Sequence, residues 1–268
     1  MYDKLYLVVN TSSIRHAGTK SEIVLILTDN NWDTIHHTFD IPEGLAEGST
    51  KVLSIDVSNR NLPNQFDHAR VGIRGADAWS PGHILLWGEK KPEQGKVFTP
   101  LALRLWGTKI STDEQEGRLS LPLSRAYESG NWVQMNRIAL VINNSKRRHA
   151  GTKNTIKIEV SLKNDISFTI DIPEGALGED GGTFLDISYA RNNTFRSTDL
   201  RSITMEIMGD DAWMPDSLFF FGLDNRSDER EYLVPFAYIP DWKEAGLPQM
   251  STDEKEGSAK VDLYRAYL

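Results

Sequence analysis

Cysteine is absent from all 268 residues of the sequence. Its absence excludes a disulfide scaffold, a zinc site built from thiolates and a cysteine nucleophile. Long apolar runs are absent too, because none approaches the roughly 18–20 residues that a membrane-spanning helix needs. The first residues, Met1–Leu5, lack the basic start and apolar core of a signal peptide. We therefore expect a cytoplasmic protein with no transmembrane segment, although export without a leader would leave the same sequence.

Positive charge is also scarce. Lys and Arg number 30 against 38 Asp and Glu, and the net charge of −8 excludes a chain-wide electrostatic footprint for nucleic acid. The 6 histidines show no HExxH spacing for zinc, and the chain has no Gly-x-Ser-x-Gly elbow, P-loop or dinucleotide-binding fingerprint. A hydrophobic content of 39% is typical of a folded chain. These observations predict a globular protein that is not an enzyme and needs no cofactor.

The two halves of the chain repeat each other. Arg15–Lys20 recurs letter for letter as Arg148–Lys153, about half the chain further along. Further motifs recur in the same order: Asp40–Gly44 with Asp171–Gly175, Asp77–Pro81 with Asp211–Pro215, Ser111–Gly117 with Ser251–Gly257, and Arg125–Tyr127 with Arg265–Tyr267. The spacing drifts by a few residues, as loop insertions produce. A repeat of this length is a whole domain rather than a solenoid unit.

Both copies read as about seven short strands separated by turns. Ile156–Val160 alternates apolar and polar residues, which predicts a strand with one buried face. A short helix could form at Pro240–Ala245, where the second copy carries extra residues. Regular short strands with Gly, Pro, Asn and Asp between them indicate an all-β fold. The sequence thus predicts two tandem antiparallel β-sandwich domains related by internal duplication, residues 1–130 and 131–268.

The first copy departs from this alternation at one strand. Ile23–Leu27 is the counterpart of Ile156–Val160, but its outward positions, Val24 and Ile26, are apolar. Such a face is either covered by the other domain or left as a sticky surface. We expect it to be covered at the contact between the domains.

The order of the motifs resembles the PLAT (lipoxygenase-homology) domain. The resemblance rests on the Ala-Gly-Thr loop Ala17–Thr19 before Ile23–Leu27, and on the Trp loop Asp77–Pro81 before the apolar strand Ile84–Trp87; the second copy repeats this order. It implies an eight-stranded sandwich of two sheets that docks proteins onto lipid, membrane or a protein partner without catalysis. Many members carry a calcium-holding Asp after Gly-Thr, where this chain has lysine in both copies.

Two recurring segments of each copy are the candidate binding end. A loop Trp can insert into an interface or stack on a sugar, but it can also pack over the sandwich edge and fix its loop. The Arg-His-Ala-Gly-Thr-Lys segment adds cations that suit an anionic head group or phosphate. The candidate ligand-binding residues are Trp79, Trp213, Arg15, His16, Lys20, Arg148, His149 and Lys153.

The recurring Ser-Thr-Asp-Glu-x-Glu-Gly segment supplies carboxylate oxygens that suit calcium. Two other interpretations stay open: an acidic turn that caps itself, or exposed ion pairs with the basic segment, each worth little. Aspartates of the Trp loop are further candidates, or turn formers. The candidate calcium ligands are Asp77, Asp113, Glu114, Glu116, Asp210, Asp211, Asp253, Glu254 and Glu256.

The sequence therefore predicts a non-enzymatic binding or adaptor protein. Its partner would be a protein or a lipid surface, engaged through loops at one end of each sandwich. Two alternatives stay open: a carbohydrate-binding protein that uses the loop tryptophans, and a neutralising or scaffold protein whose acidic surface suits a basic toxin or enzyme.

Overall fold

The computed structural model divides into two compact units, each described by itself below. Unit 1 comprises Met1–Glu128 with Arg226–Tyr232, and unit 2 comprises Ser129–Asn225 with Leu233–Leu268. The boundary predicted between residues 130 and 131 lies outside the described residues. The structure describes residues 2–28, 34–59, 66–91, 97–105, 107–113, 115–128, 134–144, 151–163, 167–172, 182–188, 195–224 and 231–263.

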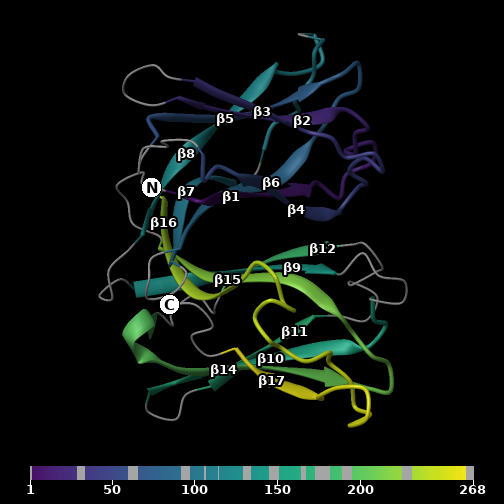
Figure 1. Cartoon of the computed structure of the whole chain (residues 1–268), viewed down its shortest axis with the longest axis vertical. Coiled ribbons are helices and arrows are strands. Elements are labelled where there is room, and N and C mark those ends of the chain that lie inside the picture. Colours follow the sequence, from purple (N-terminus) through teal and green to yellow (C-terminus); the bar gives the residue numbers. More distant parts are fainter. Residues whose placement is uncertain are drawn as a thin grey trace. The chain divides into compact units, whose positions relative to one another are not determined.

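Unit 1 is an antiparallel, nearly closed barrel of two layers (Figure 1). Its strand order is β3-β2-β5-β8-β7-β6-β1-β4. The strands are β1 Lys4–Thr11, β2 Glu22–Thr28, β3 Thr34–Phe39, β4 Thr50–Asp56, β5 His68–Arg74, β6 Pro81–Lys90, β7 Val97–Leu105 and β8 Ser120–Glu128. Strand β8 joins the layers, because Leu121 pairs with Val71 of β5 while Arg125 pairs with Ala102 of β7.

Unit 2 consists of two antiparallel sheets. One has the order β11-β10-β14-β17, and the other has the order β12-β9-β15-β16 with β13 also paired to β9. The strands are β9 Gln134–Asn144, β10 Thr155–Leu162, β11 Ser167–Ile172, β12 Gly182–Ser188, β13 Phe195–Arg196, β14 Leu200–Met208, β15 Pro215–Asp224, β16 Glu231–Ile239 and β17 Lys260–Asp262. The prediction of an all-β, antiparallel fold is confirmed.

Alternating strands build one wall of each core. On β2, Ile23 and Leu25 are fully buried while Val24 between them is half-buried, and β10 repeats this pattern with Ile156 and Ile158. Successive side chains of a strand point to opposite faces, so each strand contributes every second residue to its core. These burial patterns match the alternation that the sequence predicts for Ile156–Val160.

Strands β1 and β6 of unit 1 are buried on both faces. Leu7 and Leu86 belong to the core cluster, whereas Tyr6, Val8 and Trp87 lie on the opposite face and are still no more than 5% exposed. Burial at nearly every position explains why these strands read as continuous apolar runs rather than alternating ones.

The extra residues of unit 2 form turns rather than the predicted helix. Asp241 accepts a hydrogen bond from Ala245 N–H at 3.0 Å, but the chain turns away at Gly246, whose φ is 72°. Trp242 of this segment is 1% exposed and packs in the unit 2 core. Its ring centroid lies 6.5 Å from that of Trp213. No helix among the described residues combines the length and hydropathy required to cross a membrane.

Candidate functional site

The two recurring tryptophans lie inside their units rather than on the surface. Trp79 and Trp213 are both 0% exposed. Each pairs through its backbone with the residue before the acidic segment, Ile110 for Trp79 and Met250 for Trp213. Each therefore joins two of the recurring loops to the core.

Both indole N–H groups are hydrogen-bonded within their own unit. Trp79 Nε1 donates to Thr11 Oγ1 at 3.1 Å, and Trp213 Nε1 donates to Asn144 Oδ1 at 2.8 Å. A buried and bonded indole fixes its loop, which is the second of the two interpretations that the sequence leaves open. Neither ring is available to stack on a sugar, which was the feature behind the carbohydrate-binding alternative.

The recurring aspartates fasten the Trp loop to the basic segment. Asp77 accepts the backbone N–H of Lys20 at 2.9 Å through Oδ2, and that of Ala78 through Oδ1. Asp211 does the same with Lys153 at 3.2 Å and with the alanine that follows it. These carboxylates act as turn formers, as one of the open interpretations holds.

The acidic segments cap themselves and bind the Trp loop. In unit 1, Asp113 accepts the N–H of Gln115 at 2.9 Å, and Thr112 Oγ1 donates to the Gly75 carbonyl at 3.0 Å. In unit 2, Asp253 and Thr252 make the same bonds, to Lys255 N–H and the Gly209 carbonyl. Both segments are thus turns that are tied to the loop beside them.

The predicted calcium ligands that the structure describes lie apart from one another or serve the fold. The described residues contain no group of three or more His, Asp or Glu side chains that could hold a metal ion. Glu116 lies 3.4 Å from Lys109 Nζ, and Glu256 accepts a hydrogen bond from Ser251 Oγ at 3.5 Å. Asp210 and Glu254 are exposed, and Glu114 lies outside the described residues.

The cations of the basic segment are exposed. The side chains of Arg15, His16 and Lys20 make no polar contact within the described part of the chain. Ile14, directly before them, is 61% exposed. In unit 2, Lys153 is likewise exposed, while Arg148 and His149 lie outside the described residues.

His16 adopts a backbone conformation that most side chains avoid. Its φ is 61°, the one positive value found for a described residue other than glycine. The left-handed region costs about 1–2 kcal/mol for most L-residues. The Glu47 carboxylate accepts the backbone N–H of His16 and holds this turn. Glycine would fit the turn better, so the fold alone does not account for an imidazole here.

A hollow of about 450 Å³ lies beside this segment. Its floor is formed where Thr19 and Leu45 exchange backbone hydrogen bonds of 2.9 and 2.7 Å. A Cβ at Gly18 would lie 2.5 Å from the Leu45 carbonyl, and a Cβ at Gly44 would lie 2.6 Å from that of Thr19. The lining residues are His16, Gly18, Thr19, Lys20, Glu43, Leu45, Ala46, Glu47 and Asp77.

Carboxylates on the wall of this hollow already serve the fold. Glu43 lies 3.1 Å from Lys51 Nζ, Glu47 binds the N–H of His16, and Asp77 binds that of Lys20. The side chains of His16 and Lys20 make no polar contact within the described residues, so they have no such role. The hollow therefore presents an imidazole and an ammonium group that are not used to hold the loops together.

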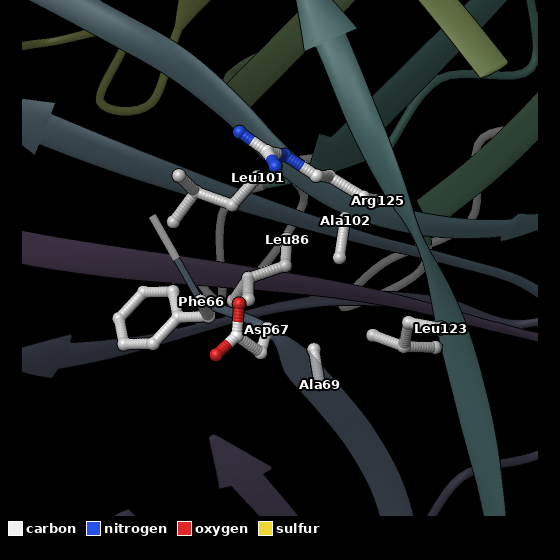
Figure 2. A pocket seen from close by; sticks show the side chains of 8 residues that line it. All are labelled: Phe66, Asp67, Ala69, Leu86, Leu101, Ala102, Leu123 and Arg125. Carbon is white, nitrogen blue, oxygen red and sulfur yellow. The ribbon is translucent and has the colours of Figure 1, made fainter. Parts of the chain in front are cut away.

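A second cavity of unit 1 is too small for a ligand. It lies between the two layers, next to β8, and Asp67 and Arg125 are the charged residues that line it (Figure 2). Its volume of about 10 Å³ is at the lower limit for a single water molecule.

The sequence prediction omitted one wall of the hollow. Glu43, Leu45 and Glu47 line it, but only Asp40–Gly44 recurs in the second copy. The recurrence of Asp40–Gly44 is the one signal in the sequence for this wall of the hollow. The positive φ of 72° at Gly44 explains why a glycine stands there. Glu47 lies outside the recurring letters, so nothing in the sequence pointed to it.

Comparisons with known proteins are sparse. No family model matches the sequence, and no curated protein matches it. Among solved structures, the alpha toxin from Clostridium absonum is similar, with 14% identity and a TM-score of 0.32. The match covers 41% of this chain and 31% of the toxin, and so spans about a third of the toxin's length.

Proposed function

We propose that the protein is a non-enzymatic binding module that engages a protein partner or a lipid surface through the loop end of each unit. One observation carries the proposal: Arg15, His16 and Lys20 recur letter for letter in the second copy, yet their side chains are exposed and make no polar contact within the described residues. The backbone N–H groups of His16 and Lys20 hold the loops through Glu47 and Asp77, but the side chains of the three residues take no part in these bonds.

The rest of the recurring segment is accounted for by the fold. Ala17 is 0% exposed, Gly18 permits the close approach of two loops, and Thr19 makes backbone bonds with Leu45. The side chains of Arg15, His16 and Lys20 are the part of the segment that the fold does not use. Together with exposed Ile14, they suit a surface that is partly apolar and partly anionic.

The proposal extends to the architecture. The two units would be tandem PLAT-like sandwiches, residues 1–130 and 131–268, that arose by internal duplication. Equivalent hydrogen bonds at Trp79 and Trp213 support this reading, as do those at Asp77 and Asp211. Two similar binding ends on one chain would then act together on a surface that presents several ligands.

The experiment compares a charge-removed variant with a matched control. R15A/K20A removes two exposed cations from unit 1, and K157A/K260A removes half-buried Lys157 and exposed Lys260 from the sheet face of unit 2. Binding is measured on vesicles of phosphatidylserine and phosphatidylcholine, and by quantitative affinity capture from the native host. We expect R15A/K20A to lose binding in one of these assays while its melting temperature stays unchanged.

The control decides how the result is read. K157A/K260A should bind as the wild type does, because its substitutions lie outside the loop end. If R15A/K20A binds both vesicles and captured proteins as well as the wild type, the loop end is not the binding site and the proposal is wrong.

A further inference from the structure

The outer face of the β10 sheet in unit 2 is a ladder of charges. Lys157 of β10 lies opposite Asp171 of β11 on one side and Glu206 of β14 on the other, and Glu206 lies opposite Lys260 of β17. Alternating signs across neighbouring strands are typical of a face that meets water. The next row runs through Thr169, Glu159, Thr204 and Asp262.

The equivalent face of unit 1 carries apolar residues at places where unit 2 has charged ones. Val24 of β2 lies opposite Thr38 and Gly72, where unit 2 has Lys157 between two carboxylates. Ile26 occupies the place of Glu159, and lies opposite His36 and Arg70. The rows continue onto β8 with Ser120 and Pro122. In Figure 1, β2, β3 and β5 lie in one layer of unit 1.

The side chains of this face are accessible. Val24 and Ile26 are half-buried, as are Lys157 and Glu159 at the equivalent places. Leu119, whose carbonyl lies against Gly72, is 64% exposed. The sheet alone accounts for this degree of burial, because the charged side chains at the equivalent places of unit 2 are half-buried too.

The charges on this face of unit 1 favour a partner that carries carboxylates. Across these two rows Arg70 carries a positive charge and no carboxylate is present, whereas unit 2 has Asp171, Glu206 and Asp262 in the equivalent positions. Arg70 Nε donates to Ser120 Oγ at 3.0 Å, which holds the guanidinium across the face. Its remaining donors can bind a carboxylate in a two-pronged manner.

We propose that this face of unit 1 binds a protein segment that carries both aliphatic side chains and carboxylates. Val24, Ile26 and Pro122 contact the aliphatic groups, and Arg70 binds a carboxylate. Unit 2 shows that polar residues suffice for the sheet, so the apolar ones serve a purpose other than folding. A second copy of the chain that binds face to face is a poor occupant, because this face carries Arg70 and offers no carboxylate for it to bind.

The experiment transfers the residues of unit 2 onto unit 1. V24K/I26E installs the pair found at Lys157 and Glu159, and R70E reverses the charge beside them. The probes are short synthetic peptides that contain aliphatic and acidic residues, and a matched set in which lysine replaces each acidic residue. Affinity is measured by fluorescence anisotropy, and folding by the melting temperature.

We expect the wild type to prefer the acidic set. V24K/I26E should weaken the affinity about tenfold, the loss expected for roughly 1.5 kcal/mol of apolar contact, and R70E should remove the preference for acidic peptides. K157V/E159I is the control, because Thr204 stands in the place of Arg70; it should gain no acidic-peptide binding. If V24K/I26E does not fold, V24T/I26T replaces it.

Other occupants give different results. Equal affinity of wild type and V24K/I26E for the acidic peptides overturns the proposal. So does self-association in the ultracentrifuge that depends on Val24 and Ile26, which would make a second copy the occupant. Binding to phosphatidylserine vesicles that V24K/I26E abolishes, without peptide binding, would assign the face to a membrane instead.

Discussion

The two units are alike at their loop ends and unlike on their outer sheet faces. At the loop ends, Trp79 and Trp213 are equally buried, and Asp77 and Asp211 bind the same backbone groups. On the sheet faces, Val24 stands where unit 2 has a lysine inside a ladder of charges. The fold thus constrains the loop framework in both units and leaves the outer faces free to diverge.

The largest expected effect tests the shared framework. Trp79→Ala and Trp213→Ala each remove a fully buried indole and should lower the free energy of unfolding by about 3–5 kcal/mol. Trp213 also packs beside Trp242, so its loss should be greater by about 0.5–1.5 kcal/mol. Differential scanning calorimetry gives the comparison, and an unchanged melting temperature for either variant would contradict the buried role.

The next largest effect concerns Asp77 and Asp211, which hold the Trp loop to the basic segment in each unit. Asp77→Ala and Asp211→Ala each remove an acceptor of two backbone N–H groups, and each should cost about 1–2 kcal/mol. The two losses should be equal if the framework is the same in both units. Denaturation by urea measures them, with the exposed Asp241→Ala, which removes the turn bond to Glu244 N–H, as a reference for an ordinary capping loss.

A smaller change of opposite sign is expected at His16. His16→Gly relieves the positive φ of 61° and should raise the free energy of unfolding by about 1 kcal/mol or less. The same variant should weaken binding at the loop end, because the imidazole is gone. A variant that loses both stability and binding would show that the imidazole supports the turn.

The smallest effect should separate the two sheet faces. Lys157→Ala removes the centre of a charged row and should cost about 0.2–1 kcal/mol at low salt, falling toward zero as salt screens the ladder. Val24→Ala changes no charge, so its effect should not depend on salt. Melting curves at low and high sodium chloride test this difference. An equal salt dependence of Lys157→Ala and Val24→Ala would contradict it.

Period-two patterns made most of the fold readable from the sequence. The predicted strands Ile23–Leu27 and Ile156–Val160 lie within β2 and β10, with the predicted residues in the core. Strand β3, Thr34–Phe39, is harder to read from the sequence, because it contains two histidines and two threonines and pairs with β2 alone among the described strands. An edge strand buries little, so its sequence carries little alternation.

The role of the loop tryptophans could not be decided from the sequence. A Trp between Ala and a residue before Pro suits either a ligand-binding role or a place in the core. The atoms that surround the ring in the folded chain decide between the two. The acceptors that settle it, Thr11 and Asn144, lie on β1 and β9, far away along the chain. Contacts between distant segments leave no local signal in the residues that make them.

Strand β8 has a consequence for the dynamics of unit 1. The strand pairs with β5 at residues that include Leu121 and Leu123, and with β7 at Ser124 and Arg125. Because both layers share β8, the strand is released from the barrel only when both sets of pairs break. The amide protons of β8 should therefore exchange with solvent only when the whole barrel opens, and should rank among the slowest of the chain to be replaced by deuterium.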